Sequence, residues 1–196
     1  MLLTPRRRKP GATAEPRCRQ RRRLLGGIAG AATLLHLPKA HANIQPLFGR
    51  ELRFDHLHTG ERLHTTYWAQ GDYVRDSLAD INHLLRDFRT GEEHPIDPRL
   101  LDLLHRLKQQ SGNDNPFQII SGYRSPRTNA RLRAASNGVA QKSLHMQGQA
   151  LDIRLPGTPL KELHRLACDA KVGGVGLYTR SNFIHIDTGR VRYWGG

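Results

Sequence analysis

The spacing of apolar residues switches along the chain between a period of two, typical of strands, and a period of about 3.6, typical of helices. Apolar and polar residues partly alternate from Leu52 to Trp68 around His58-Thr59-Gly60-Glu61, which predicts a β-hairpin. Helical spacing predicts one helix over residues 76–88. It predicts a second over residues 98–110, with Gly112 just beyond its end.

The second half of the chain alternates less regularly between short strands and helices. After a short extended leader at 43–50 and the elements above, the pattern predicts strands at 117–120, 149–155, 175–178 and 183–187, an edge strand at 191–194, helices at 125–135 and 159–170, and a polar loop at 137–144. Elements in this order predict an α+β domain, with a small, largely antiparallel sheet flanked by helices.

Residues 1–42 have the composition of an export signal. The first 23 residues carry nine lysines or arginines against one acid, Glu15, and an apolar run follows from Leu24 to Leu37. Ala40 and Ala42 then give the small-x-small pattern of a signal-peptidase site, so we expect cleavage after Ala42. The apolar run is too short for a good membrane span, so we expect no stable membrane insertion after processing.

The arginines of the signal bear on the route of export. The arginine pair before Leu24-Leu25 fits a twin-arginine signal, although no Ser or Thr precedes it and no Phe follows. We expect twin-arginine export, with general secretion as the alternative. Residues 43–196 would then form one domain in the periplasm, which we expect to be monomeric.

Removing residues 1–42 changes what the charge implies. The whole chain has a formal net charge of +14, but the remaining residues hold 21 basic and 16 acidic side chains. The excess that would indicate nucleic acid thus belongs mostly to the signal, and nucleic-acid binding is excluded. A moderate positive charge suits an anionic polymer such as peptidoglycan.

Cysteine chemistry contributes little. Cys18 lies in the signal, so Cys168 is alone in the processed chain and cannot form an intramolecular disulfide. It falls in the apolar helical pattern at residues 163–170, which favours a small buried thiol over a nucleophile.

The stretch from Ser143 to Asp152 carries the first candidate metal ligands. Ala150 and Asp152 share one face of the predicted strand, and His145 lies across the turn at Gly148. One imidazole and one carboxylate can therefore converge.

A second polar pair lies on the strand at 183–187. Ile184 and Ile186 occupy one face, and His185 and Asp187 the other. If this strand neighbours 149–155, then His145, Asp152 and His185 form a two-histidine, one-carboxylate set. Hydrolytic zinc sites use three such ligands and leave a fourth position for water.

These motifs resemble those of the zinc D-alanyl-D-alanine peptidase and Hedgehog superfamily. The runs SGYRSPRTNARLR from Ser121 and GVGLYTRSNFIHIDTGRVRYW from Gly174 are similar to the periplasmic murein endopeptidases of the MepK (YcbK-like) family. The resemblance covers roughly residues 45–194. It implies the family's fold, one Zn²⁺, and cleavage of peptidoglycan crosslinks, with preference for the direct meso-diaminopimelate to meso-diaminopimelate (3-3) bridge.

The same resemblance implies residue roles. The metal ligands carry over to His145, Asp152 and His185, and Arg124 matches the arginine that stabilises the oxyanion of the tetrahedral intermediate. Ser143 and Ser125 are weaker candidates for contacts to substrate or to the ligands.

The general base departs from the superfamily pattern. Many superfamily peptidases place an acid three residues before the last histidine, where this chain has Asn182. Hedgehog-like members place a Glu six residues before it, where this chain has Thr179. Neither side chain can take a proton from water. Asp187 is the nearest available carboxylate, as base or as the orienting group of a ligand. Activation of water by the metal alone is the fallback.

Three alternatives stay open at this stage. The domain could be a catalytically idle, zinc-stabilised module that binds peptidoglycan or a partner protein, or a murein carboxypeptidase. The hairpin histidines His56, His58 and His64 could bind a metal, although solvent-facing histidines are commoner on such hairpins.

Overall fold

The computed structural model describes residues 49–135 and 139–195. The predicted export signal at 1–42 and most of the predicted leader at 43–50 lie outside these ranges and remain predictions. Within the described residues, no helix combines the length and the apolar character needed to cross a membrane.

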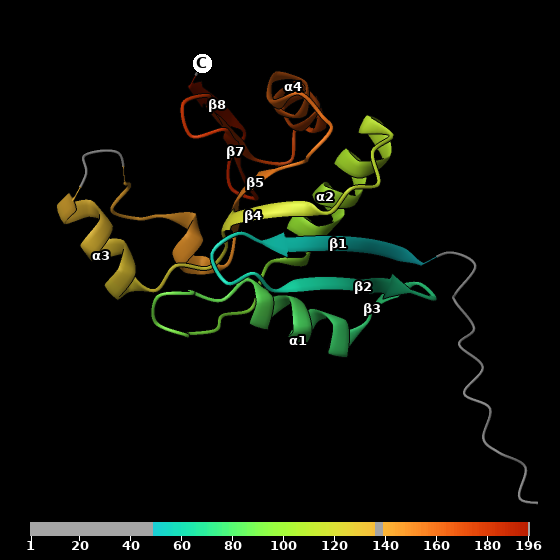
Figure 1. The fold of residues 1–196 in the computed structure, drawn as a ribbon, viewed down its shortest axis with the longest axis horizontal. Coiled ribbons are helices and arrows are strands. Elements are labelled where there is room, and N and C mark those ends of the chain that lie inside the picture. The colour runs from blue at the N-terminus through green and yellow to red at the C-terminus, as the bar shows by residue number, and fades with distance from the viewer. Residues whose placement is uncertain (1–48, 136–138, 196) are drawn as a thin grey trace, which may run out of the picture. The chain divides into compact units, whose positions relative to one another are not determined.

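One mixed sheet organises the domain (Figure 1). Its eight strands lie in the order β3-β2-β1-β4-β5-β7-β6-β8. Only the β1–β4 and β6–β8 pairs are parallel, and the other neighbours are antiparallel. The predicted α+β class with a largely antiparallel sheet is confirmed. The strands are β1 (Arg50–His56), β2 (Arg62–Ala69), β3 (Asp72–Tyr73), β4 (Phe117–Ser121), β5 (Ala150–Arg154), β6 (Gly174–Tyr178), β7 (Phe183–Asp187) and β8 (Arg192–Gly195).

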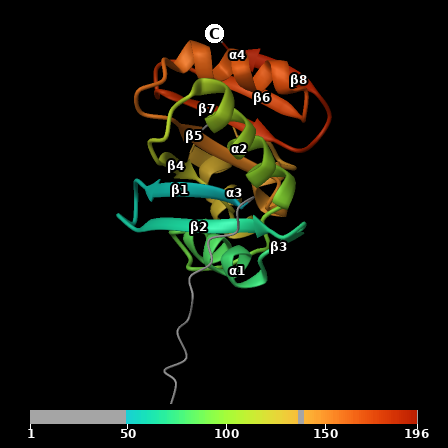
Figure 2. The ribbon, with the colours of Figure 1, turned by 90° about the vertical axis from the view of Figure 1, so that its right-hand side faces the viewer.

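The helices flank this sheet on both sides. They are α1 (Arg75–Leu84), α2 (Pro98–Ser111), α3 (Pro126–Ala135) and α4 (Leu160–Ala170), with a short 3₁₀ helix, η1 (Leu144–Gln147). Helix α2 packs against α4 and crosses one side of the sheet (Figure 2). Helix α3 lies on the other side, as the two views agree.

Helix α2 shows how sequence signals fix an element. The Asp97 side chain accepts a hydrogen bond from the backbone N–H of Arg99, and Pro98 occupies the first turn. Gly112 ends the helix in a left-handed conformation. The buried face consists of Leu100, Leu101, Leu103, Leu104 and Leu107, as the sequence predicted.

The predicted helix at 76–88 is too long. Helix α1 ends at Leu84, because Leu85 gives its carbonyl to the backbone N–H of Tyr123 instead of continuing the helical pattern. Asp87 then accepts hydrogen bonds from the N–H groups of Arg89 and Ser125. These residues tie the end of α1 to the segment before α3, and a tertiary contact therefore overrides the helical spacing.

Two short elements were not predicted. Strand β3 extends the hairpin sheet by two residues, and η1 begins at the last residue of the loop predicted at 137–144 and covers residues for which no element was predicted. The second difference matters for function because η1 carries His145.

Candidate active site

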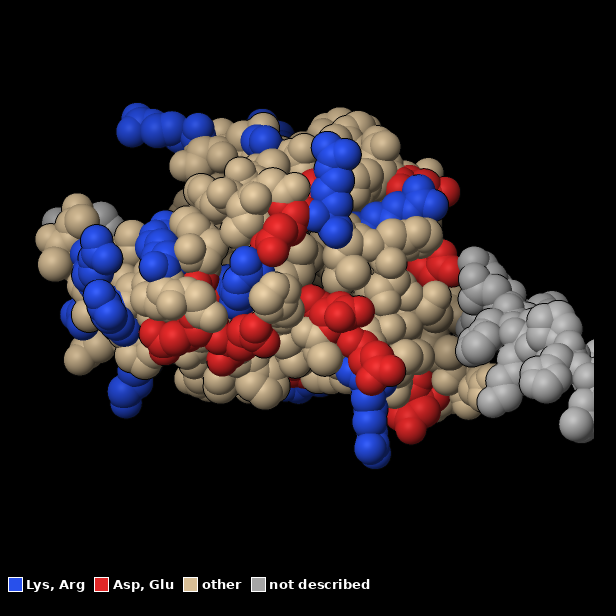
Figure 3. Space-filling view, turned by 60° about the horizontal axis from the view of Figure 1, so that its bottom comes forward, with Lys and Arg blue, Asp and Glu red and all other residues tan. Residues whose placement is uncertain are grey.

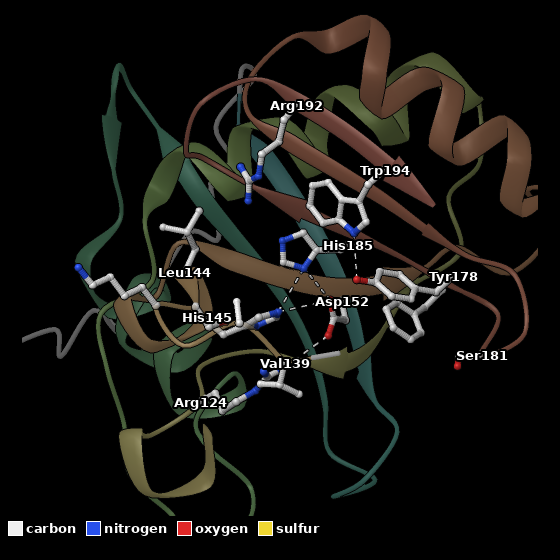
Figure 4. Close-up of a pocket in the computed structure, with 14 residues that line it drawn as sticks. Arg124, Val139, Leu144, His145, Asp152, Tyr178, Ser181, His185, Arg192 and Trp194 are labelled. Atoms are coloured by element: carbon white, nitrogen blue, oxygen red, sulfur yellow. Dashed lines mark hydrogen bonds and ion pairs between the residues drawn. The ribbon is translucent and has the colours of Figure 1, made fainter. Parts of the chain in front are cut away.

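Three side chains that could hold a metal ion, His145, Asp152 and His185, meet where η1 approaches the paired strands β5 and β7 (Figure 4). Asp152 is the cross-strand partner of His185 in the β5–β7 register. Nδ1 of His185 lies 2.9 Å from Oδ1 of Asp152 and 3.3 Å from Nε2 of His145. The remaining separation, from His145 Nε2 to Asp152 Oδ1, is 3.4 Å. The convergence expected from the sequence is therefore present.

His145 is held by the turn that follows it. Gly148 has φ +64°, and a Cβ at this position would lie 2.1 Å from the carbonyl oxygen of Pro95, so only glycine allows the turn to pack so closely. Nδ1 of His145 lies 2.8 Å from the carbonyl oxygen of Gly122. A carbonyl only accepts, so Nδ1 carries the hydrogen and Nε2 keeps a free lone pair.

His185 is oriented in the same way by Asp187. Nε2 of His185 lies 3.1 Å from Oδ2 of this carboxylate, which is fully buried. The carboxylate also accepts hydrogen bonds from the backbone N–H of Gly174 and Gly189 and from the guanidinium of Arg192. An ionised carboxylate cannot donate, so the hydrogen of the ring sits on Nε2 and the lone pair of Nδ1 faces Asp152.

The three facing atoms are consequently all acceptors. Nε2 of His145, Nδ1 of His185 and Oδ1 of Asp152 point lone pairs at one another with no hydrogen between them when both rings are neutral. Such a group repels itself unless a cation lies among its members. The arrangement therefore suits a cation, either a proton or a metal ion.

The pKa shifts of Asp152, His185 and Asp187 also favour positive charge between these side chains. Burial alone would raise the pKa of Asp152, but the charge and hydrogen bonds of His145 and His185 hold it well below its usual range. Burial would lower the pKa of His185, but hydrogen bonds with Asp152 and Asp187 outweigh it and raise that pKa. For Asp187, hydrogen bonds from His185 and Arg192 outweigh burial and lower the pKa.

The donor set fits zinc. Tetrahedral Zn²⁺ with bonds of about 2.0–2.1 Å keeps its ligand atoms about 3.3–3.4 Å apart. Two of the three separations are 3.3 and 3.4 Å, and the third is 2.9 Å. Two imidazole nitrogens and one carboxylate oxygen also match the ligand types of hydrolytic zinc, and three ligands leave a position for water.

Arg124 lies beside these ligands with unused hydrogen-bonding capacity. Its backbone N–H donates to the carbonyl of His145 at 3.1 Å, and its Nη2 lies 3.9 Å from Oδ2 of Asp152. Among the described residues its buried Nε has no partner. Burial lowers the pKa of this guanidinium. A largely buried cation with an unpaired donor is suited to hold an anionic group that enters the cleft.

The three candidate ligands and Arg124 line one cleft of about 390 Å³. Tyr178, Phe183 and Trp194 supply aromatic rings to it, and Lys142 and Arg192 supply further positive charge. Asp152 is the only carboxylate among the lining residues of the described chain. Its remaining lining residues are Val139, Ala140, Ser143, Leu144 and Ser181.

The segment that forms one wall of the cleft is entirely free of acids. No Asp or Glu occurs between Asp114 and Asp152, whereas five lysines or arginines do. At the left-hand end of Figure 3, where Figure 1 places α3, Lys and Arg side chains predominate on the surface. The approach to the cleft from α3 is therefore positively charged.

The other residues singled out from the sequence fall into different places. Thr179 and Asn182 form the β6–β7 turn and do not line the cleft, with Asn182 at φ +52°. Ser143 lines the cleft. Ser125 does not, because its hydroxyl accepts the N–H of Thr128 at the start of α3.

The hairpin histidines do not gather into a metal site among the described residues. His56 is buried, and its Nδ1 accepts the backbone N–H groups of His58 and Thr59. It therefore stabilises the hairpin turn. His64 is exposed and pairs with Glu51.

Sequence reasoning missed Lys142 and Arg192 as residues of the cleft. Lys142 lies in a loop with no periodic pattern, so its direction could not be predicted. Arg192 reaches the site because β8 pairs in parallel with β6, a long-range pairing that no local spacing reveals.

Comparison with known proteins shows the family of this chain. A family model described as peptidoglycan L,D-endopeptidase MepK matches residues 46–194. The Escherichia coli K12 protein named peptidoglycan L,D-endopeptidase MepK is 45% identical over 176 residues, which span 89% of this chain and 96% of that protein. A Haemophilus influenzae protein named probable peptidoglycan L,D-endopeptidase MepK is 39% identical over 173 residues, or 88% of this chain and 92% of that protein. This chain therefore belongs to the MepK family of peptidoglycan L,D-endopeptidases.

Proposed function

We propose that this chain is a zinc-dependent murein endopeptidase that hydrolyses peptide crosslinks of peptidoglycan. Its preferred bond is the direct meso-diaminopimelate to meso-diaminopimelate bridge. His145, Asp152 and His185 hold the metal, and Arg124 assists the reaction. Membership of a family of L,D-endopeptidases supports the bond type, because this bridge joins an L-centre carbonyl to a D-centre amine.

The observation that carries the proposal is the trio of facing acceptors at the base of the cleft. The carbonyl of Gly122 and the carboxylate of Asp187 fix both imidazole tautomers so that the two free nitrogens face Asp152. A merely structural histidine cluster gains nothing from aligning its lone pairs, whereas a metal centre requires that alignment.

Each residue has a defined task in the proposed reaction. Zinc bound here would polarise the scissile carbonyl and lower the pKa of a water molecule to about 7. Arg124 would direct a largely buried guanidinium to the carbonyl oxygen on which negative charge develops. Asp187 orients His185 and is not the base, because it lies on the far side of the imidazole and its oxygens are already occupied.

The charge of the cleft suits the proposed substrate. A meso-diaminopimelate bridge carries free carboxylates close to the scissile amide. Lys142 lines the cleft as an exposed cation without an ion pair among the described residues, and α3 adds positive charge nearby. Electrostatic attraction would concentrate and orient such a polymer at the cleft.

Digestion of purified murein sacculi by the purified chain tests this function. Zinc-loaded protein should remove 3-3 crosslinked dimers from the muropeptide chromatogram, and a chelator should abolish the effect. The His145→Ala variant should be inactive, while His64→Ala, which removes an exposed histidine on the hairpin, should behave like the wild type.

Two other outcomes of the digestion would each indicate a different function. Unchanged dimers despite bound zinc would replace the proposal with an idle binding module. Shortened stem peptides with intact crosslinks would indicate a carboxypeptidase.

We infer further that residues 1–42 export this domain to the periplasm through the twin-arginine route, and that it works there as a monomer. The basic, apolar and small-residue order of the segment supports this inference. Cell fractionation checks it. Replacing Arg22 and Arg23 by lysine should retain the precursor in the cytoplasm, whereas unchanged export would indicate the general secretory route.

A further inference from the structure

We propose that Tyr178 is a catalytic residue whose hydroxyl donates a hydrogen bond to the scissile carbonyl oxygen as negative charge develops there. This role rests on the proposed endopeptidase function. It adds a second hydrogen-bond donor, opposite Arg124, to a cleft whose described lining residues include no carboxylate besides Asp152.

Contacts with Trp194 and Phe183 fix the position of the Tyr178 side chain. Its oxygen accepts a hydrogen bond from Nε1 of Trp194 at 3.0 Å, and its ring stacks on Phe183 with centroids 4.6 Å apart. The O–H hydrogen has no acceptor among the described residues. Because the indole engages only one lone pair, the O–H hydrogen remains available to an acceptor that enters the cleft, which the partly exposed Tyr178 lines.

Trp194 in turn is fixed beside the metal-binding residues. It pairs with Gly176 in the parallel β6–β8 register, and a Cβ at Gly176 would lie 2.5 Å from Cε2 of the indole. The missing side chain forms the notch in which the ring lies. On its other side the ring centroid is 5.2 Å from that of His185. A short chain of contacts thus ties the hydroxyl of Tyr178 to a proposed metal ligand.

The donors lie on opposite sides of the proposed reaction centre. Figure 4 shows the hydroxyl of Tyr178 turned toward Asp152 and His185, with Arg124 on the other side of Asp152. A substrate carbonyl at this point would meet a guanidinium on one side and a phenol on the other. Donors fixed before the reaction stabilise the transition state more than the ground state, because the negative charge is not yet present on the bound substrate.

Tyr178→Phe tests the role with a minimal change. The variant keeps the ring and its stacking on Phe183 and removes only the hydroxyl. With a soluble 3-3 crosslinked muropeptide dimer and zinc-loaded full-length chain, kcat should fall about 100-fold, the usual effect of losing one such donor. KM, the zinc content per chain and the unfolding midpoint should stay close to those of the wild type.

Tyr193→Phe is the matched control. Tyr193 is exposed on the same strand as Trp194, and its hydroxyl bonds the carbonyl of Cys168. Its loss should leave kcat unchanged. Two results for Tyr178→Phe would each overturn the proposal: an unchanged kcat, with or without a raised KM, or a loss of zinc.

Trp194→Phe tests whether the hydrogen bond from Nε1 of Trp194 positions the hydroxyl of Tyr178. It retains an aromatic ring beside His185 but removes the Nε1 donor, so kcat should fall less than in Tyr178→Phe. The double variant should be no slower than Tyr178→Phe alone, because the hydrogen bond from Trp194 has no effect once the hydroxyl is gone. Additive losses of kcat would show that Trp194 does not act through Tyr178. An inactive wild type would overturn the proposed function and this role together, whereas an active wild type with unaffected Tyr178→Phe would overturn this role alone.

Discussion

Oδ2 of Asp187 lies 3.1 Å from Nε2 of His185, on the edge of the imidazole opposite the nitrogen that faces Asp152. The carboxylate is fully buried, and the guanidinium of Arg192 and two backbone N–H groups occupy its remaining lone pairs. Of the two roles considered for Asp187, this geometry favours orienting His185 over acting as a base.

Asp187→Asn should therefore weaken zinc binding by about 10- to 100-fold, as is usual when the partner of a metal-binding histidine is lost. The amide is neutral, and its NH₂ group would face either Arg192 or the backbone donors. Competition with a chromogenic chelator measures the affinity. Asp169→Asn, which removes an exposed carboxylate on α4, is the control and should bind zinc normally. Unaltered affinity in Asp187→Asn would remove the orienting role.

Zinc should also stabilise the fold. A ligand that binds only the native state adds about 4 kcal/mol to the free energy of unfolding when its free concentration is 1,000 times Kd. Thermal unfolding with increasing free zinc measures this gain. His145→Ala should lose most of it, and His64→Ala should keep it. An equal gain in both variants would place the zinc elsewhere.

Gly148→Ala should displace His145. Gly148 and Gly112 have nearly the same backbone conformation, with φ 64° and 62°, so alanine adds a similar strain of about 1–2 kcal/mol at each. Only at Gly148 would the new Cβ meet a backbone atom, the carbonyl oxygen of Pro95, whereas Gly112 has open space. We expect Gly148→Ala to destabilise the protein more than Gly112→Ala and to lower zinc affinity as well. Urea unfolding and chelator competition on both variants give the comparison. Equal changes in unfolding free energy and in zinc affinity would show that the turn at Gly148 can shift to accommodate a Cβ.

Asp87 should make stability depend on pH. Burial alone would raise its pKa, but hydrogen-bond donors around it, including the N–H groups of Ser125 and Arg89, lower the pKa below that of the unfolded chain. A depressed folded pKa gives stability that is fully present above the unfolded pKa, about 3.9, and is lost as the pH falls through the folded pKa. The difference in unfolding free energy between wild type and Asp87→Asn should be constant near pH 7 and shrink below about pH 4. Urea titrations across this range measure it, and a gap that widens in acid would contradict the assignment.

Lys142→Glu should weaken substrate binding through charge alone. Lys142 is exposed at the cleft and has no ion pair among the described residues, so its reversal should raise KM for an anionic muropeptide by about 3- to 10-fold, with kcat unchanged. The effect should diminish at high salt. Lys161→Glu, on the exposed face of α4, makes the same charge change outside the cleft and should leave KM unaltered. Equal shifts in both variants would indicate a general charge effect.

Local patterns predicted most of the fold because each depends on neighbours in the chain. The leucine face of α2 and the alternation of Ile184 and Ile186 with His185 and Asp187 both appear as the sequence indicated. The helix at 76–88 failed beyond Leu84, where a carbonyl bonds to Tyr123, distant in sequence. Helix η1 was missed because a single turn of 3₁₀ helix has no periodic signal.

The sequence by itself determined the α+β class and the candidate ligands His145, Asp152 and His185, since residue type and short-range spacing identify them. Tertiary structure decided how they face one another. The β5–β7 register sets Asp152 opposite His185, and the Gly122 carbonyl and Asp187 select the ring nitrogens that point inward. Only the parallel pairing of β8 with β6 brings Arg192 and Trp194 to the cleft. The physical reason is that strand pairing and hydrogen bonding across many residues depend on the packed whole, which local periodicity does not encode.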